Sequence, residues 1–274
     1  MAKIGLVISD IDGTILDQNH QLDSRLKENL AILAQQGIPF CLASARSPQG
    51  IRPIQEALGL DAPLVAYNGA LIGQWQEGEF RVLQDIPIVA ADVVALIALM
   101  EQSFPAVSIG LYAGKDWYVA QRNQWVELEA SITGEDPLVT DFEAFLAQKP
   151  VVHKFLLIGE EADITQLLAF LQEQDFPETS FYLSKANYLE ITHRSVSKGH
   201  ALALLAEMQG LPIRETLAFG DHFNDLSMLE AAGVGVAMGN APQAVQEAAD
   251  EVTADNHHNG VSLYLERVLL SETR

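Results

Sequence analysis

Two aspartates stand two residues apart near the start of the chain, directly after a short apolar run. Residues 4–9 (Ile-Gly-Leu-Val-Ile-Ser) are typical of a strand in the middle of a parallel sheet, and Asp10 and Asp12 follow it. Both carboxylates could therefore face one ligand at the carboxyl edge of the sheet. Two close carboxylates repel each other, which favours a cation between them. The alternative is a polar turn in which Thr14 acts as a cap.

A second acidic segment, Gly-Asp-His-Phe-Asn-Asp, also follows a predicted strand and ends at Asp225. Within it, Asp221 could supply another metal oxygen, and Asn224 and Asp225 share a face if a helix begins there. Taken alone, the segment is equally a helix N-cap with an acidic first turn. Together with the first pair of aspartates it predicts an oxygen-rich, octahedral Mg²⁺ site.

Two further places in the chain could bind an anion. Ser44 ends the strand predicted at residues 40–43, and Arg46 lies two positions on, so a hydroxyl and a cation fall near one spot. Ser44 is also explained as an ordinary helix N-cap. Lys198 stands where a helix begins, and the helix dipole there favours anions. The lysine therefore either accompanies a bound anion or is a solvated surface charge.

Strand and helix patterns alternate in the two flanks of the chain but not in its middle. Alternation of this kind is typical of βαβ units and a parallel sheet. Glycine-rich short strands at residues 69–83 indicate a hairpin, and the following segment mixes helices with strand pairs. We therefore expect an α/β core, residues 1–84 and 191–274, and an α+β cap inserted at residues 85–190.

The composition limits the partners and the compartment. The formal net charge of −21 repels nucleic acid and anionic membranes, so neither is expected as a partner. Any phosphate chemistry would need a local positive site for the same reason. The single cysteine, Cys41, lies in an apolar run and fits a reducing compartment. No charged-then-apolar leader is visible and no apolar run approaches ~20 residues, so we expect a cytoplasmic protein.

In their order along the chain these motifs resemble the haloacid dehalogenase (HAD) superfamily of phosphotransferases, most closely its Cof-type, class IIB subgroup. The resemblance spans nearly the whole chain: the aspartate pair comes first, Ser44 second, Lys198 third, and the segment from Gly220 to Met228 last. The insert has the length and texture of that subgroup's cap. The resemblance implies an α/β fold with a Rossmann-like parallel-sheet core and an inserted α+β cap of the C2B type.

The resemblance also implies a role for each motif residue. Asp10 would attack phosphorus, and Asp12 would act as general acid and then as general base. Mg²⁺ would be bound by Asp10, by the main-chain carbonyl of Asp12 and by Asp221. Ser44 and Lys198 would bind the phosphoryl oxygens, and Asn224 would lie near the phosphate. Asp225 would hold the metal ligands in place without itself binding the metal.

Two positions need separate comment. The subgroup commonly has Thr-Gly-Arg where this chain has Ser44, Ala45 and Arg46. Serine keeps the hydroxyl, whereas Ala45 removes a backbone freedom that glycine allows, and Arg46 is a candidate substrate contact. Asn68 resembles a residue that lines the cleft in the subgroup, although a plain hairpin turn explains it equally well.

The predicted function is that of a Mg²⁺-dependent phosphatase acting on small phosphorylated metabolites, a sugar phosphate or similar, through an aspartyl-phosphate on Asp10. A carboxylate nucleophile divides this very slow hydrolysis into two easier steps. Two alternatives stay open: a phosphomutase that uses the same intermediate, and a phospho-accepting signalling domain. Asp12 argues against the second, because an acid/base beside a phosphoaspartate hastens its hydrolysis.

Overall fold

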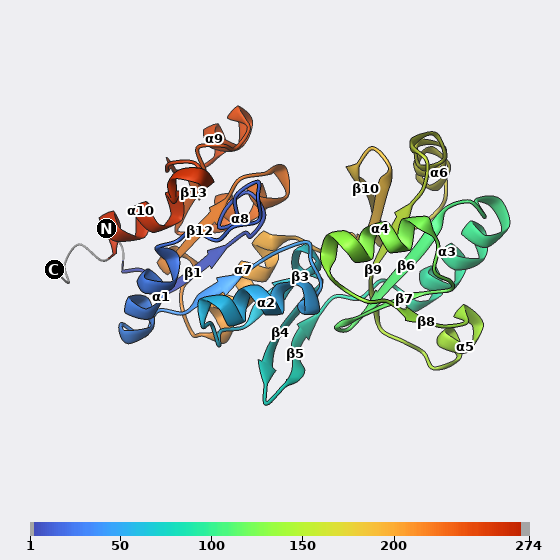
Figure 1. Ribbon diagram of the computed structural model, residues 1–274, viewed down its shortest axis with the longest axis horizontal. Coiled ribbons are helices and arrows are strands. Elements are labelled where there is room, and N and C mark those ends of the chain that lie inside the picture. Colours follow the sequence, from blue (N-terminus) through green and yellow to red (C-terminus); the bar gives the residue numbers. More distant parts are fainter. Residues whose placement is uncertain (1–2, 270–274) are drawn as a thin grey trace.

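The computed structural model describes residues 3–269, which form two lobes (Figure 1). The first lobe is built on a five-stranded parallel sheet in the order β14-β13-β12-β1-β2. Its strands are β1 (Leu6–Ser9), β2 (Phe40–Leu42), β12 (Thr216–Gly220), β13 (Val234–Ala237) and β14 (Glu251–Val252). Because β1 lies between β12 and β2, segments from both ends of the chain meet at the centre of the sheet.

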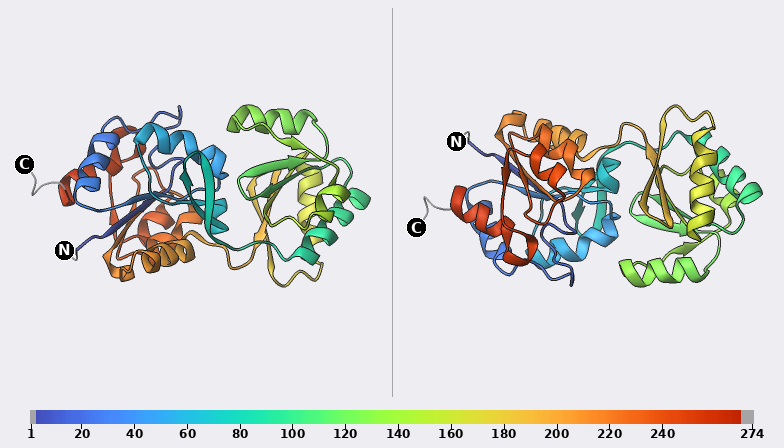
Figure 2. Two further views of the ribbon diagram at one scale, coloured as in Figure 1. Left: turned by 90° about the horizontal axis from the view of Figure 1, so that it is seen from below. Right: turned by 90° about the horizontal axis from the view of Figure 1, so that it is seen from above.

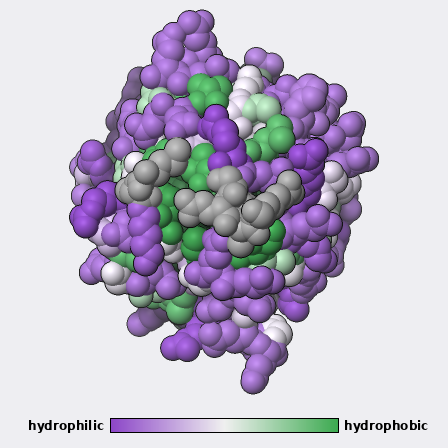
Figure 3. All heavy atoms as spheres, turned by 90° about the vertical axis from the view of Figure 1, so that its left-hand side faces the viewer, coloured by the Kyte–Doolittle hydropathy of each residue, from purple (hydrophilic) through white to green (hydrophobic). Residues whose placement is uncertain are grey.

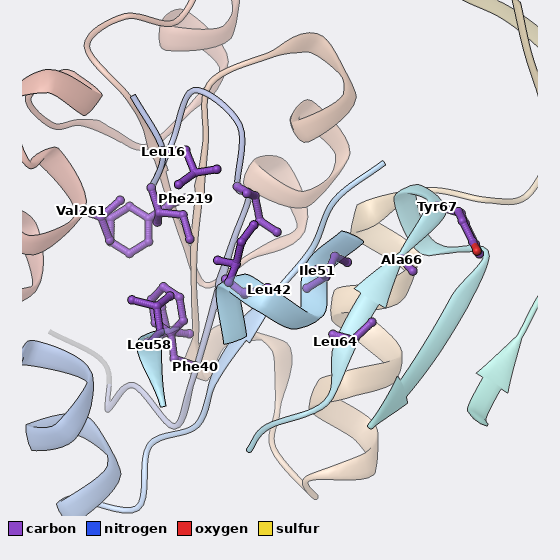
Figure 4. Close-up of a cluster of buried hydrophobic side chains, with 14 of the residues drawn as sticks. Leu16, Phe40, Leu42, Ile51, Leu58, Leu64, Ala66, Tyr67, Phe219 and Val261 are labelled. Atoms are coloured by element: carbon purple, nitrogen blue, oxygen red, sulfur yellow. The ribbon is translucent and has the colours of Figure 1, made fainter. Parts of the chain in front are cut away.

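Helices cover both faces of this sheet. They are α1 (Leu26–Gln35), α2 (Pro48–Leu58), α7 (Lys198–Met208), α8 (Leu226–Ala231), α9 (Gln243–Ala248) and α10 (Gly260–Val268). Side chains alternate along β1, so that Val7 joins an apolar layer with α1, α2 and α10, while Leu6 and Ile8 join a second layer with α7, α8 and α9. Figure 4 shows part of the first layer, in which Leu42, Ile51 and Phe219 are buried.

A small antiparallel sheet lies beside the core, on the side of the second lobe. It consists of β3 (Leu64–Ala66), β4 (Leu71–Gln76) and β5 (Glu79–Asp85), and the β4–β5 hairpin projects at the lower edge of Figure 1. The hairpin predicted at residues 69–83 is thus confirmed. A single parallel bridge between Ala43 and Val65 connects this sheet to the end of β2.

The second lobe, which we call the cap, is a six-stranded sheet with four helices. Its sheet order is β10-β11-β9-β6-β7-β8, and neighbouring strands are antiparallel except β7 and β8. Its elements are α3 (Ala90–Ser103), β6 (Ser108–Ala113), β7 (Asp116–Val119), α4 (Gln124–Thr133), β8 (Leu138–Val139), α5 (Phe142–Ala147), β9 (Val152–Ile158), α6 (Glu161–Gln172), β10 (Thr179–Lys185) and β11 (Tyr188–His193).

The two faces of the cap sheet have different neighbours. Leu111, Phe155 and Leu157 pack in an apolar cluster with α3, α5 and α6, which lie on the side away from the core. Tyr112 and Tyr188, on the other face, belong to the same apolar cluster as the first core layer. The apolar interior therefore continues from the core into the inner face of the cap, and the two views of Figure 2 show this face turned toward the core.

Helix α2 spans Pro48–Leu58, and local signals in the sequence mark both of its ends. The Ser47 side chain accepts the Gly50 N–H at 2.9 Å, and Pro48 occupies the first helical position. The helix ends at Gly59, whose φ of 71° is the left-handed conformation that glycine adopts without strain. This helix is placed by its own start and stop signals.

The ends of the described chain lie far from the cap. Figure 3 shows that end of the core, where apolar side chains gather on the surface. Ile4, Ile38 and Leu211 line a depression there. Across residues 3–269, no helix is both long enough and apolar enough to cross a membrane.

The expected division into a core at 1–84 and 191–274 and a cap at 85–190 stays a proposal, and the separate sheets support it. One chain crossing runs from β5 to α3 and the other from β11 to α7. Position 190 lies inside β11, which pairs with β9 and β10. By its pairing, the whole of this last strand belongs to the cap sheet.

Candidate active site

The candidate site lies at the carboxyl edge of the parallel sheet, where neighbouring strands end. Asp10 follows β1, Asp221 follows β12 and Ser44 lies just beyond β2. Because β1 pairs in parallel with both other strands, the three residues leave the sheet at the same edge. Lys198 reaches this place as the first residue of α7, whose N-terminus is capped by the Ser197 side chain.

Lys198 is fully buried and joins two carboxylates. Its Nζ donates to Asp10 Oδ1 and, at 2.5 Å, to Asp225 Oδ1. The second oxygen of Asp225 accepts the backbone N–H groups of Asp221 and His222, both at 2.9 Å. Since both of its oxygens are engaged, Asp225 fixes the position of Lys198 and of the backbone at residues 221–222.

The charges at this site shift one another's protonation. Burial raises the pKa of Asp10 well above its usual range, although Lys198 opposes the shift. Burial, and then the neighbouring Asp225, raise the pKa of Asp221 to about 6. Burial alone would lower the pKa of Lys198, but Asp10 and Asp225 raise it. The lysine is therefore firmly cationic, whereas burial makes Asp10 and Asp221 harder to ionise than exposed carboxylates.

The clustering of carboxylates at this edge fits a divalent cation, which would stabilise their charged forms. Oxygens of Asp10, Asp221 and Asp225 all lie within 4.8 Å of one another. Both oxygens of Asp225 are engaged by Lys198 and by backbone N–H groups, whereas those of Asp221 accept only from two neutral side chains, Thr14 at 3.0 Å and Asn240 at 3.4 Å. Asp10 and Asp221 are therefore the two carboxylates better placed to bind a metal. The backbone also leaves room for the cluster: a Cβ on Gly13, whose φ is +87°, would lie 2.3 Å from Asp221 Oδ2.

Asp12 is held by Arg46 at the side of the site that faces the cap. The guanidinium makes two parallel hydrogen bonds, from Nε to Oδ2 at 2.8 Å and from an Nη to Oδ1 at 2.6 Å. The Asp12 side chain is 45% exposed, and both residues line a cavity of about 360 Å³ between core and cap. The structure thus places Arg46, predicted as a phosphate or substrate contact, on the carboxylate predicted as the acid/base.

The remaining predicted residues lie around this edge. Ser44 is buried, and its Oγ accepts the Arg46 N–H at 3.2 Å. Asn224, from the turn η3 (Phe223–Asp225), donates to Asn68 Oδ1 at 3.1 Å. Asn68 in turn reaches the hydroxyl of Tyr182 on the cap at 3.5 Å. Asn68 has φ of 57°, a left-handed conformation that asparagine tolerates better than most residues.

Sequence reasoning missed several polar residues that the structure brings to the site. Asn240 donates to the Gly13 carbonyl at 2.9 Å, and it follows β13, so the strand-edge rule applied to the other motifs could have found it. Lys154 of the cap donates to the Ala45 carbonyl at 3.1 Å. No local signal marks Lys154, because its partner depends on how the cap sits over the core.

Comparison with known proteins places the chain in a family. Residues 7–265 match the model of the haloacid dehalogenase-like hydrolases. A Haemophilus influenzae protein whose phosphatase designation is provisional is 37% identical over 95% of this chain and 96% of its own length. The HMP-PP phosphatase of Citrobacter koseri is 31% identical over 88% of this chain and 87% of its own length.

A solved structure agrees with these sequence matches. A haloacid dehalogenase-like hydrolase from Bacteroides thetaiotaomicron superposes with a TM-score of 0.87 at 29% identity, covering 97% of this chain and 100% of that one. The family, the parallel-sheet core with a separate cap, and the enzyme class of a phosphoric monoester hydrolase, all implied by the sequence motifs, are thereby confirmed. The chain belongs to the haloacid dehalogenase-like hydrolases.

Proposed function

We propose that this protein is a Mg²⁺-dependent phosphatase that hydrolyses small phosphorylated metabolites through an aspartyl-phosphate on Asp10. One arrangement carries the proposal: the Asp10 carboxylate is held through one oxygen by the buried Lys198, with Asp221 beside it and Asp12 at the cavity. The other Asp10 oxygen is left to attack. A nucleophile, a fixed cation and a second carboxylate two residues away are the parts that two-step hydrolysis requires.

In the first step, the free oxygen of Asp10 forms a bond to phosphorus as the ester P–O bond breaks. The leaving oxygen takes a proton from Asp12. For Asp12 to carry that proton, its contact with Arg46 has to open, because both Asp12 oxygens accept hydrogen bonds from the guanidinium. The phosphoryl group of the substrate is another anion that Arg46 can bind. Substrate binding would therefore move the guanidinium from Asp12 to the phosphoryl oxygens.

In the second step, Asp12 is a carboxylate and takes a proton from a water molecule. The water oxygen bonds to phosphorus, the bond to Asp10 breaks, and inorganic phosphate leaves. Lys198 stays on the oxygen of Asp10 through both steps, because Asp225 holds it from the other side. Ser44, Asn224 and the start of α7 lie at the same edge and are proposed to hold the phosphoryl oxygens.

Mg²⁺, bound by Asp10, Asp221 and the main-chain carbonyl of Asp12, would neutralise the negative charge that otherwise repels the phosphate from the carboxylates. Two observations support this ion. Burial, and then the neighbouring Asp225, raise the pKa values of Asp10 and Asp221, so a cation beside them would stabilise their charged forms. The donor set consists of oxygens alone, which hard divalent cations prefer.

The cavity between core and cap favours a small leaving group. Its volume of about 360 Å³ falls in the range of sites for small organic molecules. We propose a sugar phosphate or a metabolite of similar size. The chain has a single cysteine, Cys41, and therefore no intramolecular disulfide, so we propose that the enzyme works in a reducing compartment, the cytoplasm.

The experiment measures phosphate release from a panel of phosphorylated metabolites, with and without Mg²⁺. Asp10→Asn should lower the rate by about three orders of magnitude or more, because it removes the nucleophile with little change of shape. Asp175→Asn, an exposed acid on the cap, is the matched control and should keep the rate. Undiminished release by Asp10→Asn would contradict the mechanism, and transfer to a second sugar without free phosphate would indicate a mutase.

A further inference from the structure

The cavity above the active site carries a polar pair that the proposed chemistry does not use. Asp12 and Arg46 line its core end, and Glu129 and Tyr188 line its cap side. Glu129 belongs to α4 and Tyr188 begins β11, so two different elements of the cap bring them together. They lie on the inner face of the cap, where a leaving group attached to a phosphate at Asp10 would extend.

Both members of this pair are buried with unmet hydrogen-bonding capacity. Glu129 is 7% exposed and Tyr188 is 4% exposed. Within residues 3–269, Glu129 Oε2 and the Tyr188 hydroxyl have no hydrogen-bond partner. Burial, and then Glu129 as a nearby charge and acceptor, raise the pKa of Tyr188. The two groups are therefore neighbours, although no hydrogen bond of normal geometry joins them. Buried polar atoms without partners are uncommon and destabilise the fold. A ligand whose groups donate hydrogen bonds to this pair would remove that cost.

Lys154 and Arg46, the cations at the deeper part of the cavity, already have partners. Lys154 donates to the Ala45 carbonyl and lies 3.4 Å from the buried Glu190. Arg46 is held by Asp12. Lys185 is exposed, and its Nζ lies over the Tyr188 ring at 4.2 Å from the centroid. The cap side of the cavity therefore offers free acceptors and no buried cation that is free of a partner among the described residues.

We propose that Glu129 and Tyr188 are specificity-determining residues, which accept hydrogen bonds from hydroxyl or amino groups of the leaving group and so disfavour leaving groups that carry a carboxylate or a second phosphate. This inference rests on the proposed phosphatase function and adds the polarity of the substrate's other end. A donor satisfies the orphaned oxygen, whereas a second anion beside buried Glu129 meets like charge in a poorly solvated site.

The test uses three compounds that share a six-carbon skeleton and its phosphate: glucose 6-phosphate, glucosamine 6-phosphate and 6-phosphogluconate. Each competes against hydrolysis of p-nitrophenyl phosphate, so that its inhibition constant is obtained whether or not it is itself turned over. The inhibition constants of the hydroxyl and amino compounds should be lower than that of the carboxylate compound by roughly tenfold or more. Glu129→Gln should reduce this ratio by about tenfold, because a neutral amide replaces the charge at nearly constant shape.

Control measurements distinguish a failure of the specificity role from a failure of the phosphatase activity. Glu161→Gln, an exposed glutamate at the start of α6, should leave the ratio unchanged, and thermal unfolding of Glu129→Gln shows whether the variant is folded. Equal inhibition by all three compounds, no inhibition by any, or a ratio that Glu129→Gln does not alter would overturn the specificity role. The phosphatase itself fails only if the native chain does not hydrolyse p-nitrophenyl phosphate or if Asp10→Asn hydrolyses it equally well.

Discussion

Replacing Lys198 by methionine tests whether one buried cation holds the carboxylates of the site together. Methionine keeps an apolar stem of similar length and removes the charge. The side chains of Lys198 and Asp225 are 0% exposed and that of Asp10 is 9% exposed, so water cannot replace the lost cation. Removing one partner of a buried ion pair costs about 3–5 kcal/mol. For a chain of this size, that loss lowers the unfolding midpoint by about 6–20 °C.

The pH dependence of this loss has a definite sign. Burial raises the pKa of Asp10 even with the lysine present, and without Lys198 the pKa in the fold rises further above the unfolded value near ~3.9. A carboxyl whose pKa is raised by folding stabilises the fold below its unfolded pKa, and this stability is lost as the pH rises through the folded pKa. Lys198→Met should therefore be destabilised less at pH 5 than at pH 8.

The assay is thermal unfolding followed by circular dichroism, in EDTA, at both pH values. Lys27→Met, an exposed lysine of α1, is the matched control and should change stability by no more than about 0.5 kcal/mol. Adding Asp225→Asn to Lys198→Met should cost less than the sum of the single changes, because the two residues are in contact. A loss below about 1 kcal/mol for Lys198→Met, or an equal loss at pH 5 and pH 8, would mean that Lys198 does not hold the buried carboxylates together.

Three further predictions concern the metal site, pH and the cap. Gly13→Ala puts a Cβ 2.3 Å from Asp221 Oδ2 and should weaken Mg²⁺ binding roughly tenfold or more in calorimetric titration, whereas Gly37→Ala, also at positive φ but with open space around it, should not. Burial lowers the pKa of His153, so the stability that the neutral imidazole contributes above its unfolded pKa near ~6.5 is lost as the pH falls. In urea unfolding between pH 5 and 7, the free energy of unfolding of His153→Gln should therefore depend less on pH than that of the native chain. An equal pH dependence for the two proteins would contradict this. Lys154→Met leaves a buried carboxylate without its cation and should lower the unfolding midpoint by several degrees, about 2–4 °C per kcal/mol lost.

Much of the fold could be predicted because its signals are local. The helix over residues 48–58 carries its own cap and stop, and β1, β2 and β12 are short, mainly apolar runs that end close to Asp10, Ser44 and Asp221. Asp10 and Asp221 could be placed together although 211 positions separate them, since the edge of a parallel sheet collects strand ends. By contrast, β8 could not be predicted, because its two residues are exposed and have no apolar periodicity.

Side-chain partners were harder to predict than backbone positions. The sequence placed Arg46 near the phosphate site, and the structure shows its guanidinium on Asp12. A long side chain with five donors binds whichever anion comes within reach, and that depends on tertiary structure. The proposed exchange of Arg46 from Asp12 to the phosphoryl group would reconcile the two positions.

The chemistry and the selectivity of this site depend on different parts of the chain. The Asp10–Lys198–Asp225 network is made by core residues at strand ends and at one helix start, where sequence motifs are informative. Glu129 and Tyr188 come from a helix and a strand of the cap, and among residues 3–269 neither donates to nor accepts from that network. A substitution in the cap can therefore change which leaving group is accepted without disturbing the nucleophile, so the natural substrate has to be sought through the polarity of the cavity rather than through the motifs.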